Sequence, residues 1–549
     1  MKKSSTLVGI AALLIVLGGA AWLNRKEVIL WLVTTLAKDR DIAPYSPVAW
    51  NEGPAAAPAG DRPPNIVFIL ADDLGINDIS AFGGGVAGGR VPTPNIDRLA
   101  KEGALFAQAY AGTASCAPSR AMILTGRYPT RTGFEFTPTP DGMGRMVAMF
   151  SDNERSGLPP VDWNRDADDK VPSFDEQGLP GSEITIAEIL KGAGYHTVHI
   201  GKWHLGSGKE FGANAQGFDE SLLMASGLHL PEDDPGVVNA KLDFDPIDRF
   251  LWARMQYAAS FNEGPLFAPG GYLADYWTDE AVKVIRANRN RPFFLYLAHW
   301  GVHTPLQATR ADYEAVGDIK PHRLRVYAAM VRSLDRSVGR VLATLKAEGL
   351  DENTIVVFSS DNGGAGYVGL PDINAPYRGW KLTMFEGGIR VPLFMRWPAR
   401  IAPGTRIEKP AGHIDLMPTF AAAAGAPLPA GVAIDGVDLL APEAPKRADD
   451  ALFWQSAYYR VVRQGGWKLQ VTERPKKTWL FDLAADPTEK VNLAEREPAR
   501  VAAMTALLDA HRKAGRAPLY PHTIEAPVAV DKTLAERVGP RDEFIYWPN

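Results

Sequence analysis

The chain has 549 residues with a formal net charge of −5; 46% of its residues are hydrophobic and 22% are charged. This composition excludes an intrinsically disordered chain, because it supplies enough apolar side chains to bury a large core. Lysine and arginine form no long basic run, so the sequence also argues against nucleic acid as a partner.

The N-terminal segment, residues 1–40, combines Lys2 and Lys3 with an apolar run over residues 7–23. This pattern is typical of an export signal, and the run also lies at the short end of the roughly 17–25 residues that a membrane-spanning helix needs. Small residues at 18–21 offer cleavage sites, whereas a second apolar patch within 27–36 favours an uncleaved anchor. We predict an exported protein, bacterial periplasmic, membrane-anchored or secreted; a cleaved signal, an anchor through residues 7–23 and a pair of buried core helices all stay open.

Residues 41–64 are rich in proline, alanine and glycine and predict an extended linker. From Asn65 onward, short continuous apolar runs of strand length appear at 66–70, 195–200, 292–297 and 354–358. Helical patterns separate these runs, at 184–192, 275–287 and 324–348. The alternation predicts an α/β domain over 65–450, with a large, mixed but mostly parallel sheet sandwiched by helices and functional residues at the carboxyl ends of its strands.

The C-terminal region, residues 451–549, has a different texture. Its strand-like runs at 452–455, 459–462, 467–471 and 478–482 are followed by a helical pattern over about 498–513. These patterns predict a smaller antiparallel sheet with one helix. The tail from Arg516 shows little periodicity, and we expect it to wrap over the surface.

Acidic and amide side chains follow two of the predicted strands in the α/β domain. Asp72 and Asp73 come after the run at 66–70, and Asp361 and Asn362 come after the run at 354–358. Either pair alone is usually a turn or a helix cap. Taken together, their oxygens form a hard-ligand set that suits Ca²⁺ or Mg²⁺.

The single cysteine, Cys116, excludes an intramolecular disulfide and a Cys-x-x-Cys metal site. A lone cysteine is often a small buried hydrophobe. This one, however, begins the run Cys116-Ala117-Pro118-Ser119-Arg120, and Leu-Thr-Gly follows at 124–126. The run resembles the signature of the sulfatase family, in which the cysteine is oxidised to formylglycine.

Three further stretches carry the same resemblance. Residues 201–206 read Gly-Lys-Trp-His-Leu-Gly, 301–305 read Gly-Val-His-Thr-Pro, and 378–392 contain Arg-Gly-Trp-Lys. Alone, a lysine or histidine at a strand end is usually a solvated or hydrogen-bonded side chain. In these family motifs the active-site positions are Lys202, His204, His303 and Lys381, whereas the nearby His299 is off the pattern and is expected to be structural.

The resemblance runs from about residue 65 to 397 and implies an alkaline-phosphatase-like fold that hydrolyses sulfate esters to an alcohol and inorganic sulfate. It implies catalytic roles for Cys116, Arg120, Lys202, His204, His303 and Lys381, with Lys202, His303 and Lys381 also binding substrate. It implies a metal site, Ca²⁺ in preference to Mg²⁺, at Asp72, Asp73, Cys116, Asp361 and Asn362. A sulfated small molecule or carbohydrate is the implied substrate, and a formylglycine-generating or equivalent maturation enzyme is an implied partner.

The same resemblance implies the order of events. A hydroxyl of hydrated formylglycine attacks sulfur while the metal and Arg120 hold it; Lys202 and Lys381 meet the sulfuryl charge, and His303 or Lys381 assists the leaving alcohol. His204 then takes a proton from the second hydroxyl, so that sulfate is released.

Two other functions stay open at this point. A phosphonate monoester or phosphodiester hydrolase of the same superfamily uses the same core residues, and a non-catalytic protein that binds sulfated ligands would keep Cys116 as a thiol. We also predict that segments 134–151 and 208–270 shape the pocket for the leaving group.

Overall fold

The computed structural model describes residues 24–25, 28–29, 41–57, 60, 62–151, 153–208, 210–442 and 446–549. Most of the predicted signal or anchor, residues 1–40, and all of the run at 7–23 therefore lie outside the described residues. Within the part of the chain that is described, no helix has both the length and the apolar character needed to cross a bilayer.

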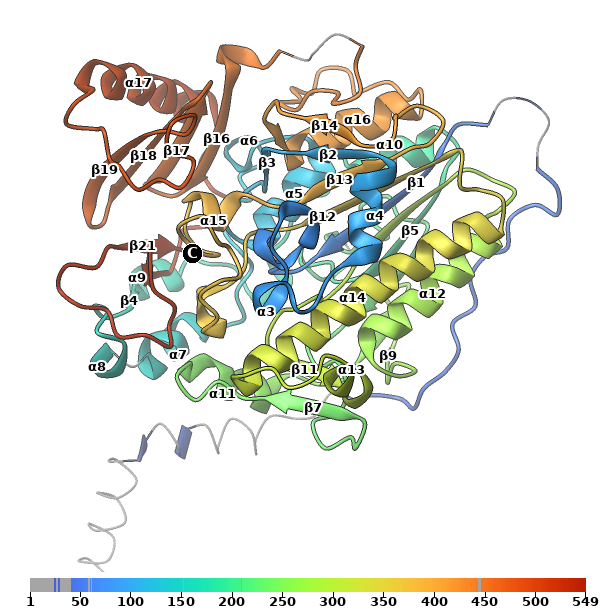
Figure 1. Ribbon diagram of the computed structural model, residues 1–549, viewed down its shortest axis with the longest axis horizontal. Coiled ribbons are helices and arrows are strands. Elements are labelled where there is room, and N and C mark those ends of the chain that lie inside the picture. Colours follow the sequence, from blue (N-terminus) through green and yellow to red (C-terminus); the bar gives the residue numbers. More distant parts are fainter. Residues whose placement is uncertain are drawn as a thin grey trace, which may run out of the picture.

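A ten-stranded mixed sheet runs through the larger part of the molecule, in the order β14-β2-β13-β12-β1-β10-β5-β6-β8-β9 (Figure 1). Its strands are β1 (Asn65–Ala71), β2 (Ala104–Phe106), β5 (His196–Gly201), β6 (Glu220–Met224), β8 (Ala259–Phe261), β9 (Leu266–Phe267), β10 (Phe293–Ala298), β12 (Thr354–Ser360), β13 (Leu393–Arg396) and β14 (Thr405–Ile407). The five strands from β12 to β6 are parallel, whereas β13, β8 and β9 pair antiparallel near the edges. This sheet confirms the predicted fold class.

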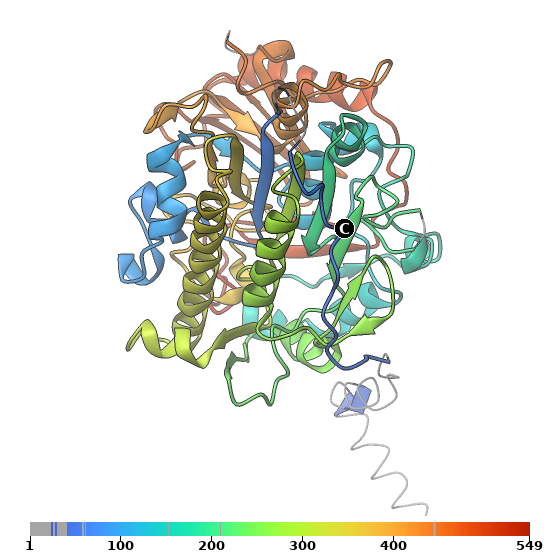
Figure 2. The ribbon, with the colours of Figure 1, turned by 90° about the vertical axis from the view of Figure 1, so that its right-hand side faces the viewer.

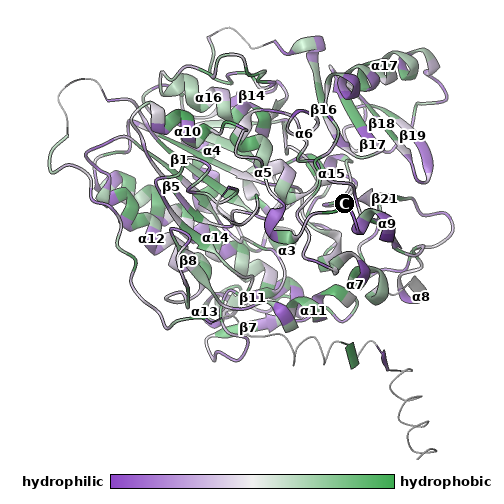
Figure 3. Ribbon diagram, turned by 180° about the vertical axis from the view of Figure 1, so that it is seen from behind, coloured by the Kyte–Doolittle hydropathy of each residue, from purple (hydrophilic) through white to green (hydrophobic). Residues whose placement is uncertain are grey.

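Helices cover both faces of this sheet (Figures 1 and 2). One face packs against α4 (Pro94–Glu102), α12 (Leu273–Ala287) and α14 (His322–Ala347), and the other against α5 (Cys116–Thr125), α10 (Ile186–Gly192) and α16 (Leu416–Ala423). Successive side chains of β1 alternate between the two apolar cores, with Val67 in one and Phe68 in the other. Because β1 is buried along its whole length, it reads as a continuous apolar run, and Figure 3 shows hydrophobic residues gathered in these central strands.

A separate four-stranded antiparallel sheet follows in the C-terminal region, with strands β16 (Ala451–Ser456), β17 (Tyr459–Gln464), β18 (Trp467–Glu473) and β19 (Lys476–Asp482). Helix α17 (Pro498–Ala514) places Met504 and Leu508 in one apolar cluster with Val462 and Leu469 of this sheet. This is the smaller sheet with one helix that the sequence predicts.

The tail differs from the sequence-based expectation, because it contains two strands. β20 (Ile524–Ala529) pairs with β21 (Phe544–Pro548) and with the short β4 (Asp162–Trp163) from the α/β region. Pro527 interrupts the amphipathic alternation of β20, and its partner β4 lies far away in the chain, so neither signal is visible in a local window. The tail therefore forms part of a three-stranded sheet and is not simply irregular.

The remaining strands and helices are short connections around these sheets. They are α3 (Val86–Gly89), β3 (Ala109–Tyr110), α6 (Pro129–Thr132), α7 (Met143–Phe150), α8 (Asn153–Ser156), α9 (Arg165–Asp168), β7 (Val237–Ala240), α11 (Pro246–Arg254), β11 (Leu306–Thr309), α13 (Arg310–Ala315), α15 (Glu386–Ile389) and β15 (Ala411–Gly412).

Candidate active site

The carboxyl edge of the large sheet brings three carboxylates together. Asp72 and Asp73 follow β1 and Asp361 follows β12, and these strands are parallel neighbours whose last pair is Ala71 with Ser360. The backbone N–H of Asp73 donates to Asp361 Oδ1 at 3.3 Å. All three side chains are buried, so their charges need nearby cations.

Arg120, on α5, supplies one of these cations. It is fully buried; its Nη2 lies 3.0 Å from Asp72 Oδ2, and its Nε donates to Asp361 Oδ2 at 2.9 Å. Nη1 donates to the carbonyl oxygen of Lys202 at 2.7 Å, so one guanidinium ties together the ends of β1, β12 and β5. Lys202 adds a second cation, with Nζ 2.6 Å from Asp72 Oδ2. Burial opposes ionisation of Asp72, but Lys202 and Arg120 outweigh it and lower the pKa of this carboxyl.

Lys381 neutralises the neighbouring carboxylate, Asp73. Its Nζ lies 2.8 Å from Asp73 Oδ1, 3.2 Å from Tyr367 Oη and 3.3 Å from His303 Nε2. The hydroxyl of Tyr367 donates to Asp73 Oδ2 at 2.7 Å. Burial acts to lower the pKa of Lys381, but Asp73 outweighs it and the pKa rises well above its ordinary value. Lys381 is therefore a charged hydrogen-bond donor at neutral pH.

His303 is held in one orientation beside Lys381. Its Nδ1 lies 2.7 Å from the carbonyl oxygen of Thr304, which can only accept, so Nδ1 carries the proton and Nε2 of the neutral ring faces Lys381. The Trp300 ring stacks on the imidazole with a centroid separation of 4.0 Å. Burial lowers the pKa of His303 to about 4, so the ring is neutral at neutral pH.

Cys116 is the first residue of α5 and lies against the same carboxylates. Its thiol donates to Asp72 Oδ1 at 3.5 Å and lies 3.9 Å from Asp73 Oδ1. Burial, Asp361 and Asp72 all raise the pKa of the thiol. An unmodified Cys116 is thus protonated in these surroundings and a weak nucleophile.

The oxygen donors at this point fit a hard divalent cation. Asp72, Asp73, Cys116 and His303 offer ligand atoms that all lie within 4.8 Å of one another, and the two carboxylates are the hard oxygen ligands of this group. Asn362 donates through Nδ2 to Asp73 Oδ1 at 2.8 Å, while its Oδ1 is buried and accepts no hydrogen bond from the described residues. An orphaned amide oxygen beside buried carboxylates is the chemistry that Ca²⁺ or Mg²⁺ satisfies.

His204 follows β5, two residues after Lys202. Its Nδ1 is buried and finds no partner among the described residues. Burial, Lys202 and Arg120 lower its pKa well below the ordinary value, so the imidazole is neutral and able to accept a proton.

Backbone strain accumulates around these residues. Asp73 has φ of 59°, His204 has φ of 63°, and Leu382, next to Lys381, has φ of 69°. A non-glycine residue in this left-handed backbone conformation costs on the order of 1 kcal/mol or more. Such strain persists where the surrounding structure enforces it, often at functional sites.

The structure therefore joins nine of the ten predicted site residues through direct contacts, and the tenth, His204, follows two residues after Lys202 in the chain. Sequence reasoning did not single out Tyr367 or Trp300, although each lies within a few residues of a predicted motif. His299, which is off the family pattern, contacts Ser337 Oγ through Nε2 at 2.8 Å instead.

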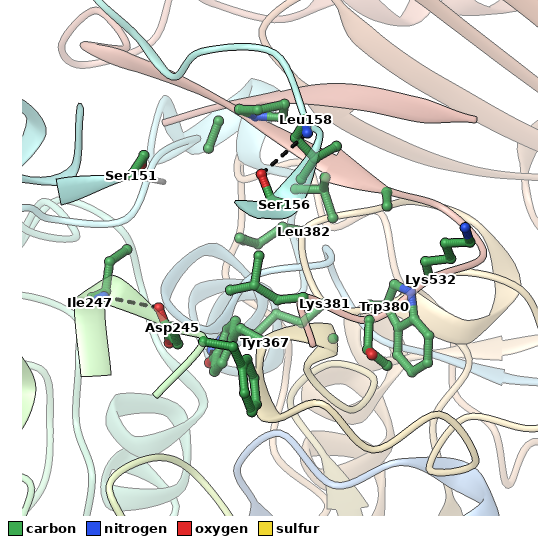
Figure 4. A pocket seen from close by; sticks show the side chains of 18 of the residues that line it. Ser151, Ser156, Leu158, Asp245, Ile247, Tyr367, Trp380, Lys381, Leu382 and Lys532 are labelled. Carbon is green, nitrogen blue, oxygen red and sulfur yellow. Dashed lines mark hydrogen bonds between the residues drawn. The ribbon is translucent and has the colours of Figure 1, made fainter. Parts of the chain in front are cut away.

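A cavity of about 320 Å³ opens beside Lys381 and His303 (Figure 4). Residues 147 and 151 of the segment 134–151 line it, as do residues 244, 245, 247 and 251 of the segment 208–270. The structure thus places parts of both predicted pocket segments beside the site. A third wall comes from residues 526–529, 532–534, 536 and 538 of the tail, which the sequence analysis did not assign to the pocket.

Comparison with known proteins gives a consistent result. The model of the Sulfatase family matches residues 64–426, and a model of the C-terminal part of N-sulphoglucosamine sulphohydrolase matches residues 378–513. Both matched ranges end before residue 526.

Individual relatives agree with the family models. Steryl-sulfatase of Mus musculus is 31% identical over 573 residues, covering 85% of this chain and 84% of the relative. N-acetylgalactosamine-6-sulfatase of Mus musculus is 34% identical over 393 residues, covering 70% and 67%. The crystal structure of Ps i-CgsB in complex with k-i-k-neocarrahexaose superposes with a TM-score of 0.68 at 30% identity, covering 84% of this chain and 95% of that chain.

Proposed function

The chain belongs to the sulfatase family and hydrolyses sulfate esters, and we propose that it does so with formylglycine made from Cys116 and a divalent cation, Ca²⁺, bound nearby. Asp72, Asp73, Asp361, Asn362 and position 116 would hold the cation. The observation that carries the proposal is the place of Cys116: a buried thiol 3.5 Å from Asp72 Oδ1, inside a cluster of paired charges. The comparisons do not favour a phosphonate hydrolase or a non-catalytic binding protein.

The two groups supply distinct chemistry when present. Hydrated formylglycine supplies one hydroxyl that attacks sulfur and a second whose deprotonation expels sulfate, and the cation supplies positive charge to the sulfuryl oxygens. Among the residues of this chain, Arg120 fixes the carboxylates in place through its bonds to Asp72 and Asp361. Lys202 and Lys381 add positive charge in a buried setting, where it stabilises developing negative charge most strongly.

Protons move at the two ends of the site. His303 and Lys381 face the pocket, so they lie on the side where the alcohol leaves, and Lys381 is charged and able to donate a hydrogen bond to the departing oxygen. His204 is neutral and its Nδ1 has no partner among the described residues, which suits the ring to accept the proton of the second hydroxyl.

The proposal is tested by the mass of the tryptic peptide Glu102–Arg120 from protein purified from its native host, together with turnover of an aryl sulfate and of a phosphonate monoester. We expect a formylglycine mass, Ca²⁺-dependent release of sulfate, and much slower phosphonate hydrolysis. An unmodified cysteine in a fully active preparation would contradict the proposed catalyst, and a preference for the phosphonate would contradict the proposed specificity.

We further propose that residues 1–40 direct export and that a maturation enzyme oxidises Cys116. The basic start and the apolar run at 7–23 support export. Cell fractionation with N-terminal sequencing of the mature protein tests it: recovery of the intact chain in the cytoplasm would contradict export.

A further inference from the structure

We propose that the alcohol released by this enzyme is apolar, and that the pocket beside Lys381 and His303 binds it. This inference rests on the proposed function, because it assigns a class of leaving group to the same site. It commits to a sulfate ester of a compact hydrophobic alcohol or phenol, as opposed to a sulfated sugar.

The first argument is the chemistry of the pocket walls. Helix α7 contributes Val147, and the segment after α8 contributes Leu158 and Val161. Residues in and next to α11 contribute Phe244, Ile247 and Leu251. These side chains give the pocket an aliphatic and aromatic lining around the catalytic residues Lys381 and His303. Such a surface gains free energy by covering apolar atoms and offers little to hydroxyl groups.

The second argument is that several polar side chains of the wall already have partners. Ser151 Oγ donates to the Val147 carbonyl oxygen at 2.8 Å. Asp245 Oδ1 accepts from the Ile247 N–H at 2.9 Å as the N-cap of α11, a bond drawn as a dashed line in Figure 4. Lys532 Nζ lies 2.8 Å from Asp542 Oδ2. A sugar needs several convergent donors and acceptors, and these groups are engaged within the protein.

A fourth pair, between two polar residues of the wall, is also hydrogen-bonded within the protein. Glu536 Oε2 accepts from both the N–H and the hydroxyl of Thr533, at 3.0 Å and 2.8 Å. This carboxylate oxygen is therefore engaged in a turn of the tail and is not free to accept from a sugar hydroxyl.

The third argument is the origin of the remaining wall. Val528, Leu534 and Val538 come from the tail, and the Leu534 N–H donates to the carbonyl oxygen of Gly366, next to Tyr367. These residues lie beyond both ranges matched by the family models, so the family match by itself does not account for this wall. β20 fixes the wall by pairing with β4 and β21.

Size points the same way. At about 320 Å³ the cavity lies at the lower end of the roughly 300–1,000 Å³ range of small-molecule sites, which suits one compact ring system better than several sugar units.

The test uses the full-length, matured enzyme and compares kcat/KM for phenyl sulfate, a fused-ring aryl sulfate, and a 6-sulfated N-acetylhexosamine. We expect kcat/KM for the fused-ring ester to exceed that for the sulfated sugar by at least about 100-fold, and we expect the fused-ring ester to have the lower KM. Preference for the sulfated sugar would overturn this inference while leaving the proposed function intact. Failure to release sulfate from any ester would overturn the proposed function itself.

Two pocket variants and a matched control sharpen the test. Leu251→Asp and Leu534→Asp place a charge in walls from different parts of the chain, and each should lower the ratio of fused-ring to sugar activity by at least about tenfold. Leu428→Asp introduces the same change at a leucine that is 42% exposed and outside the pocket, and should leave the ratio unchanged. An unchanged ratio in both pocket variants would overturn the inference.

A measurement on the unaltered enzyme guards against misfolded variants. With phenyl sulfate as substrate, a fused-ring phenol such as naphthol should inhibit competitively at concentrations at least about tenfold lower than N-acetylhexosamine. Equal inhibition by the two alcohols would contradict an apolar leaving-group pocket.

Discussion

Two buried charge clusters of this molecule lie at different interfaces and can be compared directly. We name Asp72, Asp73, Arg120, Lys202, Asp361 and Lys381 the site cluster, and Glu386, Arg390, Lys468 and Glu489 the scaffold cluster. The site cluster lies at the edge of the large sheet beside the pocket, whereas the scaffold cluster joins the α15 region to the four-stranded sheet.

The scaffold cluster is closely paired within itself. Lys468 Nζ lies 2.9 Å from both Glu386 Oε1 and Glu489 Oε1, and Arg390 Nη1 lies 3.1 Å from Glu386 Oε2. The Glu386 N–H donates to Glu489 Oε2 at 2.6 Å. Burial acts to raise the pKa of Glu386, but Lys468 and Arg390 outweigh it and lower the pKa to about 2.

The comparison teaches that buried charge and a shifted pKa do not by themselves mark a reactive site. Both clusters have them. The site cluster differs in two respects. Three non-glycine residues with a left-handed backbone lie in it or beside it, Asp73, His204 and Leu382, against Glu489 in the scaffold cluster. Beside it lies a buried acceptor without a hydrogen-bond partner among the described residues, Asn362 Oδ1, whereas the corresponding atom of the scaffold cluster is a donor, Arg390 Nε. These features indicate surroundings arranged for a group that arrives from outside.

The largest effect is expected from Cys116→Ser, which should remove activity at the site cluster while leaving the stability of the fold unchanged. A serine supplies one hydroxyl but no second one to expel sulfate, so kcat should fall by about 10³-fold or more. Chemical denaturation should show the free energy of unfolding within about 1 kcal/mol of the parent. Parental turnover by this variant would show that the site cluster works without formylglycine.

Lys468→Met should produce the opposite pattern. Removing the shared cation leaves Glu386 and Glu489 buried without their common partner, so the free energy of unfolding should fall by about 3–5 kcal/mol. The kcat of the remaining folded enzyme should be unchanged. The control, Lys409→Met at an exposed lysine, should change stability by no more than about 0.5 kcal/mol; a similar small effect at 468 would contradict the scaffold role.

Calcium should stabilise the protein through the site cluster alone. At a free concentration 100 times its Kd, a ligand that binds only the folded state adds about 2.7 kcal/mol to the free energy of unfolding. We expect chelation to remove this increment and the activity together, and Asp73→Asn to abolish the response. Lys468→Met should respond to calcium by the same increment; loss of the response there would mean that the clusters are coupled.

The smallest effect concerns His299, which serves the fold and not the chemistry. Burial lowers its pKa to about 4 in the folded protein, below the ordinary 6.5, so the unfolded chain binds more protons between these values. The contribution of neutral His299 to the free energy of unfolding is fully present above pH 6.5 and is lost as the pH falls toward 4. At pH 5 the loss amounts to about 2 kcal/mol. His299→Gln should flatten the dependence of unfolding free energy on pH by this amount; an unaltered slope would contradict the assignment.

The sequence predicts most of the site because its chemistry is carried by short motifs. Strand ends followed by Asp72 and Asp361, and the run beginning at Cys116, are visible in local windows, and parallel strands place such ends at one edge. The double pairing of Arg120 with both carboxylates is not visible, since it depends on α5 meeting the ends of two strands, β1 and β12. Tyr367 was missed for the same reason: its partner, Asp73, is 294 residues away.

The sequence predicts the strands that are buried along their whole length. It does not predict β20, which lacks a local pattern. The central strands read as apolar runs because helices cover both of their faces. β20 was missed because Pro527 breaks its pattern and its neighbours β4 and β21 are supplied by other parts of the chain. Because the sequence does not predict β20, it also does not predict the third wall of the pocket, which the tail forms.

The burial of Cys116 sets an order of events during biosynthesis. Its side chain is 3% exposed and lies under neighbours drawn from positions 72 to 381, so a second enzyme cannot reach it once the sheet has closed. The proposed oxidation must therefore occur on a nascent or unfolded chain. β1 pairs with β10 and β12, both distant in sequence, and such long-range parallel closure is intrinsically slow, which leaves time for that reaction. A chain that folds first would be sealed as a stable but inert thiol form, and refolding purified protein in the absence of the maturation enzyme would not rescue it.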